Sequence, residues 1–162
     1  MTVTDEFRAA RDQLIELRSD YDTARERFEW PRFTHFNFAL DWFDKVAENN
    51  DSPALWIVEQ DGSEGKWSFA ELSARSNQVA NYFRRAGIKR GDHVMVMLNN
   101  QVELWETMLA GIKLGAVLMP ATTQLGPIDL SDRVERGRAE FVVAGPDDAA
   151  KFDEVESEVV RI

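Results

Sequence analysis

The sequence of 162 residues carries 19 Lys and Arg against 29 Asp and Glu, for a formal net charge of −10, and it has no cysteine. The lack of cysteine excludes disulfides, thiolate metal sites and a cysteine nucleophile. The acidic balance argues against a nucleic-acid partner, because a phosphate backbone needs clustered Lys and Arg. The composition, with 44% hydrophobic and 30% charged residues, is that of a globular protein. No apolar run reaches the roughly 20 residues of a membrane-spanning helix, and no signal peptide opens the chain, so we expect a soluble, cytoplasmic protein.

Two amphipathic helices are predicted in a helical lead, residues 1–50. Apolar side chains recur at alternating three- and four-residue steps through residues 5–28, and Trp30-Pro31 ends that helix. The repeat spans about three heptads, so the helix packs either against its own globular body, which we favour, or against a partner helix. Residues 34–50 form the second predicted helix, whose aromatic face we interpret as core.

A β-hairpin is predicted at residues 51–68. Two short runs of strand-forming residues, 54–59 and 66–68, flank a sequence rich in turn residues. A helix follows, because Ser68 and Glu71 have the spacing of a capping box, in which the hydroxyl accepts from the N3 amide and the carboxylate from the cap amide.

Strands and helices alternate through residues 69–162. Apolar runs too short for a helix predict strands that are buried on both faces, and amphipathic segments between them predict helices. Such alternation favours a parallel sheet with helices on its faces. We therefore predict an α/β fold in which the helical lead and the hairpin precede a partial parallel sheet. The expected strands are 94–98, 116–119, 140–144 and 159–162, and the helices between them are 101–114, 129–138 and 146–158.

The sequence contains no familiar catalytic motif. It has no Gly-x-Ser-x-Gly elbow, no Gly-x-Gly-x-x-Gly turn and no phosphate loop of the Walker type. The two histidines, His35 and His93, lie far apart in the sequence. Asp129, Asp132 and Glu135 recur at a spacing that suits a hard cation, but the arginines between them favour a solvated helix face. The acidic residues of 147–158 are likewise interpreted as helix surface, so we predict no catalytic, cofactor-binding or metal-ligating residue.

Several motifs occur in an order that resembles one enzyme superfamily. WSFAEL at 67–72, GIKRGDHV at 87–94 and AGIKLGAVLMP at 110–120 resemble the early core of the adenylate-forming enzymes, which include acyl-CoA synthetases, adenylation domains and luciferases. FNFA at 36–39 and PATTQL at 120–125 are similar to the medium-chain acyl-CoA synthetase branch. The likeness covers about residues 34–145. We interpret the glycines of these motifs as residues of turns and helix ends, so the motifs have a structural role.

The resemblance implies a parent enzyme that activates a fatty or aryl carboxylate with ATP and Mg²⁺ to an acyl-adenylate and passes the acyl group to CoA. The family's phosphate-binding loop, which should follow a strand like the one at 159–162, has no counterpart in the sequence. We therefore expect residues 1–162 to be the N-terminal portion of the large AMP-binding domain, inactive alone and without a cofactor of its own. Its partner would be the remainder of the enzyme, and the uncovered helix at 101–114 would make the fragment self-associate.

Two other interpretations stay open. The acidic surface and the heptad-spaced first helix suit a stand-alone, non-catalytic binding or regulatory module that reuses the scaffold. The same fold would also serve another acid substrate, such as an aryl or acetyl group. The reading frame of the gene distinguishes the stand-alone module from a fragment, because the frame of a fragment continues past Ile162.

Overall fold

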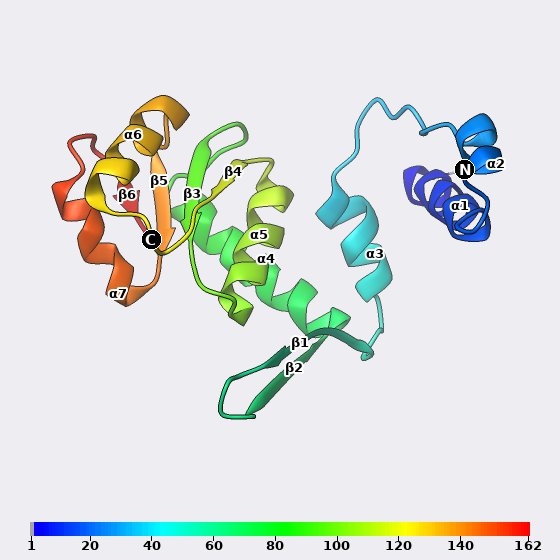
Figure 1. Ribbon diagram of the computed structural model, residues 1–162, viewed down its shortest axis with the longest axis horizontal. Helices are drawn as coiled ribbons and strands as arrows, with labels where there is room; N and C mark the ends of the chain where they lie inside the picture. Colours follow the sequence, from blue (N-terminus) through cyan, green and yellow to red (C-terminus); the bar gives the residue numbers. More distant parts are fainter. Residues whose placement is uncertain (1) are drawn as a thin grey trace.

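A four-stranded parallel sheet, packed between helices, lies toward one end of the computed structural model, which describes residues 2–162 (Figure 1). Its strand order is β4-β3-β5-β6, and each neighbouring pair is parallel. The predicted α/β class is thereby confirmed. The strands are β3 (His93–Met97), β4 (Val117–Pro120), β5 (Phe141–Ala144) and β6 (Val160–Arg161).

Strand β3 directs alternate side chains to two separate hydrophobic clusters. Val94 and Val96 pack with residues of α4 (Phe69–Arg85) and α5 (Val102–Leu114). Met95 and Met97 face the other side, where they pack against α6 (Pro127–Gly137) and the short C-terminal helices. Successive side chains of a strand point to opposite faces, so this one strand carries both halves of the core. Helices therefore cover both faces of the sheet, as the apolar runs predicted.

Helix α4 begins at the predicted capping box. The Ser68 hydroxyl accepts from the Glu71 amide at 3.1 Å, and the Glu71 carboxylate accepts from the Ser68 amide at 2.8 Å. Gly87 follows the helix with a φ of 102°, a left-handed conformation that suits glycine. Helix α5 packs against α4, and its residues Leu109 and Ala110 are buried. Among its large apolar side chains, Trp105 stays exposed.

The predicted hairpin is confirmed as β1 (Pro53–Val58) and β2 (Glu64–Ser68), an antiparallel pair. Its outer face carries Trp56, whose indole N–H donates to the Glu64 carboxylate at 3.1 Å. The Lys66 ammonium lies 3.9 Å from the Trp56 ring centroid. These cross-strand contacts support a two-stranded ribbon that would be marginal without packing.

The prediction of one helix over residues 5–28 is wrong. The chain forms α1 (Val3–Glu16) and α2 (Tyr21–Arg27), with a turn between them. Asp20 starts the second helix, because its carboxylate accepts from the Thr23 amide at 3.1 Å and caps it. Figure 1 shows both helices at one end of the molecule, away from the sheet.

Two further helices differ from their predicted lengths. The segment predicted at 34–50 begins only after Asn37, whose side-chain oxygen accepts from two following amides, and it forms a π-helix, η1 (Phe38–Phe43), before α3 (Asp44–Ala47). The segment predicted at 146–158 is one turn, α7 (Pro146–Ala149), followed by a 3-10 helix, η2 (Ala150–Glu154). It ends early because the chain turns to place β6 beside β5.

A buried lysine joins the helical lead to the body. The Lys113 side chain is 4% exposed, and its ammonium donates to the Asp44 carboxylate at 2.7 Å, the Asn77 side chain at 2.8 Å and the Ser73 carbonyl at 3.3 Å. All three ammonium protons therefore have acceptors. The Asn37 amide adds a 2.6 Å bond to the Ile112 carbonyl, so η1 and α3 are fixed to both α4 and α5.

Helix α1 docks on this segment through aromatic contacts. The Phe7 ring centroid lies 5.0 Å from that of Phe36 and 4.9 Å from that of Trp42. The Thr4 hydroxyl donates to the Asp41 carbonyl at 2.7 Å. Within residues 2–162, no helix has the length and apolar character needed to cross a membrane.

Replacing Lys113 by Met should lower the free energy of unfolding by about 2–3 kcal/mol. This is less than the roughly 3–5 kcal/mol of a fully buried pair, because Asp44 keeps some contact with water. Urea denaturation measures the loss, and the double variant Lys113→Met/Asp44→Asn should recover part of it, since no unpaired charge remains. A single variant as stable as the wild type would show that the ion pair does not hold the lead in place.

Replacing Ser68 by Ala should cost about 1 kcal/mol at neutral pH through the lost helix cap. Hydrogen bonds from the Ser68 amide and then from its hydroxyl hold the pKa of the Glu71 carboxyl below its usual value. The carboxylate therefore stabilises the fold above its unfolded-state pKa, and this contribution disappears as the pH falls through the lowered pKa. Urea midpoints at pH 7 and pH 3 should show a smaller difference between variant and wild type at pH 3. An unchanged difference would contradict a charged capping box.

Candidate functional site

The carboxyl ends of the parallel strands form one edge of the sheet, and three loops meet there. In open α/β sheets, ligands bind outside this edge. β3 leads into residues 98–101, β4 into 121–126 and β5 into Gly145. The Ala121 amide donates to the Val96 carbonyl at 2.9 Å and keeps the second loop against the end of β3.

Polar groups at this edge are engaged with one another. The Thr123 hydroxyl donates to the Asn99 side-chain oxygen at 3.1 Å. The Lys151 ammonium donates to the Thr123 carbonyl at 2.5 Å and forms an ion pair with Asp148 at 2.7 Å. The edge therefore gathers hydroxyl, amide and ammonium groups from three segments of the chain.

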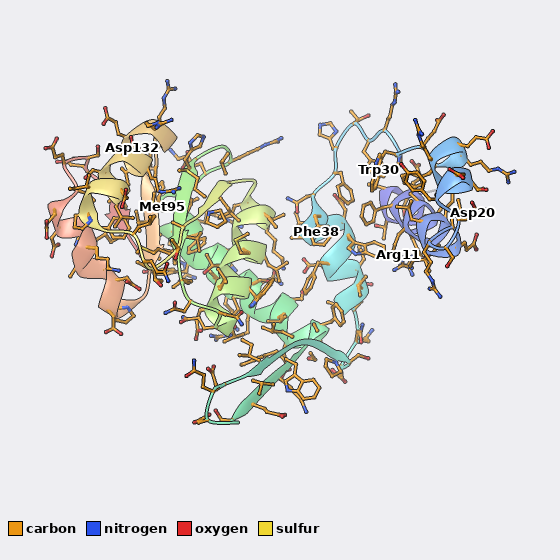
Figure 2. The ribbon with its side chains drawn as sticks, viewed as in Figure 1. Arg11, Asp20, Trp30, Phe38, Met95 and Asp132 are labelled. Carbon is orange, nitrogen blue, oxygen red and sulfur yellow. The ribbon has the colours of Figure 1, made fainter. Side chains whose placement is uncertain are left out.

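A cleft of about 480 Å³ lies between α6 and the face of the sheet formed by β3 and β4. Met95 and Met119 supply its apolar part, while Asp129, Asp132, Arg133 and Arg136 supply charges from α6. Figure 2 labels Met95 on the sheet and Asp132 on the helix. Because both signs of charge are interleaved along the cleft, it has no single preference for a cation or an anion.

Of the three carboxylates noted in the sequence, Asp129 and Asp132 line this cleft. Asp132 is paired with Arg136 at 3.6 Å on the exposed side of α6, and Glu135 is not among the residues that line the cleft. Throughout residues 2–162, no cluster of three His, Asp or Glu side chains is arranged to hold a metal ion. Asp129, Asp132 and Glu135 are all exposed on α6, as expected of a solvated helix face, and the absence of a metal ligand stays a prediction.

The two histidines lie in different places. His35 lines a cleft beside the C-terminal end of α5. The Nδ1 atom of His93 lies 2.5 Å from the Gly137 carbonyl, and because a carbonyl only accepts, Nδ1 carries the proton and donates. His93 therefore joins the start of β3 to the end of α6, and no contact brings it near a nucleophile.

Sequence reasoning missed the residues at the carboxyl edge. Asn99, Thr123 and Lys151 come from three segments, and no motif links them. The rule that ligands bind at the carboxyl ends of parallel strands would have singled out the first two, since each follows a predicted strand. The prediction that the chain contains no catalytic, cofactor-binding or metal-ligating residue stays a prediction.

Comparisons with known proteins agree on one family. The family model described as "AMP-binding enzyme" matches residues 42–162. Human mitochondrial acyl-coenzyme A synthetase ACSM2B is 41% identical over 130 residues, which are 76% of this chain and 22% of that protein. Rat mitochondrial ACSM4 is 38% identical over 149 residues, 88% of this chain and 26% of that protein.

Solved structures show the same fold. The acyl-CoA synthetase of Brucella canis matches with a TM-score of 0.78 and 27% identity over 88% of this chain and 28% of that chain. A benzoate CoA ligase from Burkholderia xenovorans LB400 matches with a TM-score of 0.66 and 22% identity, covering 78% of this chain and 25% of that chain. In each comparison the chain spans about a quarter of the protein it matches.

Millimolar Mg²⁺ should leave the melting temperature of the 162-residue chain unchanged. The reason is that Asp132 is already paired and that Arg133 and Arg136 offset the acidic charge of the cleft. Thermal unfolding with Mg²⁺, and with NaCl at equal ionic strength as the control, measures this. A saturable rise that Asp132→Asn abolishes would contradict the expectation.

Proposed function

The chain belongs to the family of AMP-binding enzymes, and we propose that it is the N-terminal part of an AMP-forming acyl-CoA synthetase. The observation that carries this proposal is the 38–41% identity with acyl-CoA synthetases over most of the chain, which spans only about a quarter of each relative. The parent enzyme would join a carboxylic acid to ATP, release pyrophosphate, and pass the acyl group from the adenylate to CoA with release of AMP.

In this proposal residues 1–162 supply scaffold to the N-terminal portion of the large AMP-binding domain. The lead, the hairpin and the alternating segment correspond to residues 1–50, 51–68 and 69–162. β6 lies at an edge of the sheet, where a further strand of a longer chain has room to pair. The groups that hold ATP, Mg²⁺ and CoA would then lie in the parent enzyme outside residues 1–162, and this part alone would be inactive.

The proposed acid substrate is a medium-chain fatty or an aryl carboxylate. The medium-chain choice follows from the resemblance of FNFA at 36–39 and PATTQL at 120–125. We also propose a cytoplasmic location, although the names of the related mammalian enzymes place those proteins in mitochondria. Self-association of the 162-residue chain through its uncovered helix at residues 101–114, a surface distinct from the N-terminal helices, remains part of the proposal.

Pyrophosphate release tests the function. Octanoate or benzoate is mixed with ATP, Mg²⁺ and CoA, and the 162-residue chain is compared with the longer protein from the same gene. We expect release from the longer protein and none from the 162-residue chain, with a reaction that lacks acid as the control. Release by the 162-residue chain would show that it is catalytically complete. A reading frame that stops at Ile162 would instead favour the non-catalytic module.

A further inference from the structure

The two N-terminal helices have almost no core of their own. Ala10 is the buried residue of α1, and α2 has none. Large apolar side chains remain exposed on and around these helices, namely Ile15, Tyr21, Trp30, Phe38 and Leu40. Ile15 and Trp30 line one groove, and contiguous apolar surface of this kind marks an interaction site.

The exposed surface contains an apolar groove of about 290 Å³. Phe7, Leu14, Ile15 and Trp30 line it, together with Arg11 and Arg18. Figure 2 shows Arg11 on α1 and Trp30 close to that helix. Trp30 is 67% exposed and Ile15 is 47% exposed, so the groove lies open to solvent.

The groove continues an interface that already exists. Phe7 packs on Phe36 and Trp42, and the Arg11 guanidinium lies 5.0 Å from the Trp42 ring centroid. The same stripe of α1 then passes into the groove at Leu14 and Arg18, which lie three and seven residues after Arg11 on one helix face. An occupant of the groove would therefore lie next to η1 and extend the contact that docks α1.

The chemistry of the groove favours a protein segment with carboxylates. Arg18 makes no ion pair within residues 2–162, whereas Arg11 is paired with Asp12. Residues 2–40 contain six Arg and no Lys, and Arg, Trp and Tyr are enriched at protein interfaces. The same residues contain eight Asp and Glu, so the region lacks the positive charge that attracts a helix to a membrane surface.

A second copy of the chain fits this surface poorly. In a two-fold antiparallel pairing of α1 through the groove, the Arg11 side of one copy would face the Arg18 side of the other. Like charges in contact across an interface disfavour the pairing. The formal net charge of −10 on each copy adds to the repulsion.

We propose that the groove is covered by an apolar segment with flanking carboxylates, supplied by the part of the same polypeptide that follows Ile162. This inference rests on the proposed function, in which about three quarters of the enzyme lies outside this chain. The family match begins at residue 42, so α1 and α2 lie outside the matched segment. Their role is then to fasten the N-terminus to the later part of the enzyme.

Single cysteines test the inference, since the 162-residue chain has none. Ile15→Cys places a thiol in the groove, and the matched control Ala9→Cys places one on the exposed far side of α1. Each is reacted with a maleimide in the 162-residue chain and in the longer enzyme, and mass spectrometry of the peptide gives the rate. In the longer enzyme we expect about tenfold slower labelling at residue 15 and a change under about twofold at residue 9, because an interface core excludes solvent.

A charge reversal provides the second variant. Arg18→Glu, added to Ile15→Cys in the longer enzyme, should raise the labelling rate about fivefold, because it opposes the carboxylates of the covering segment. Equal labelling rates of residue 15 in both proteins would overturn the inference. Slower labelling of residue 15 at higher concentrations of the 162-residue chain would also overturn it, because that result indicates that a second copy covers the groove. Pyrophosphate release is measured on the same preparations. If the longer enzyme releases pyrophosphate but residue 15 is labelled as fast as in the 162-residue chain, only this inference is refuted. If residue 15 is protected but no pyrophosphate is released, only the proposed function is refuted. The lack of a longer reading frame refutes both.

Discussion

Strand β3 is buried on both faces, and the helices of the α/β body pack against one face or the other. Val94 and Val96 meet α4 and α5, while Met95 and Met97 meet α6 and η2. Two strands, β4 and β5, pair with its edges. A polar side chain at any of these four positions would enter one of the two clusters without a hydrogen-bonding partner, at a cost that the surrounding packing does not offset. This strand also positions the loop at the carboxyl edge of the sheet, because the Ala121 amide donates a hydrogen bond to the Val96 carbonyl.

The helical lead depends on a different kind of contact. Hydrophobic packing alone is not directional. The three hydrogen bonds of the Lys113 ammonium are directional, because Asp44, Asn77 and the Ser73 carbonyl must converge around it to receive them. This cluster orients η1 and α3, and they in turn present Trp42 to Phe7 of α1. The junction lies just inside the segment that the AMP-binding family shares, which begins at residue 42. The family scaffold therefore carries the attachment point for a region that the family model does not include.

Elements with local chemical signals were predicted well from the sequence. The Ser68–Glu71 box placed the start of α4, and short apolar runs placed β3 and β5, because a strand buried on both faces needs no information beyond its own residues. Residues 5–28 were predicted as a single helix because the apolar spacing continues through the turn between α1 and α2. Apolar periodicity carries no information about the cap at Asp20 that begins the second helix. The π-helix after Asn37 was also missed, since its spacing differs little from that of an α-helix over a single turn.

The candidate site was harder to predict because it depends on strand register. Asn99, Thr123 and Lys151 are separated by more than 20 residues in the chain, and parallel pairing of β3, β4 and β5 is what brings them together. Asp129, Asp132 and Glu135 are exposed on α6, as expected from the arginines that interleave with them, because that interleaving is a local signal. Contacts such as that of Lys113 with Asp44 carry no sequence signal at all, since either residue alone is typical of a surface.

The strand order also constrains how the chain can be synthesised and folded. β3 precedes both of its neighbours in the sequence, so the central strand leaves the ribosome before either of the strands that pair with it. Parallel pairs require a crossover between them, and closing these loops is slow compared with forming the hairpin or helix α4. The pairing of β3 with β5 therefore cannot form until residue 144 has emerged, and during that interval the cluster of α4 and α5 lacks Phe141 and Val143. The order of the elements in the chain makes the nascent protein most exposed to aggregation after α5 has emerged and before β5 has done so.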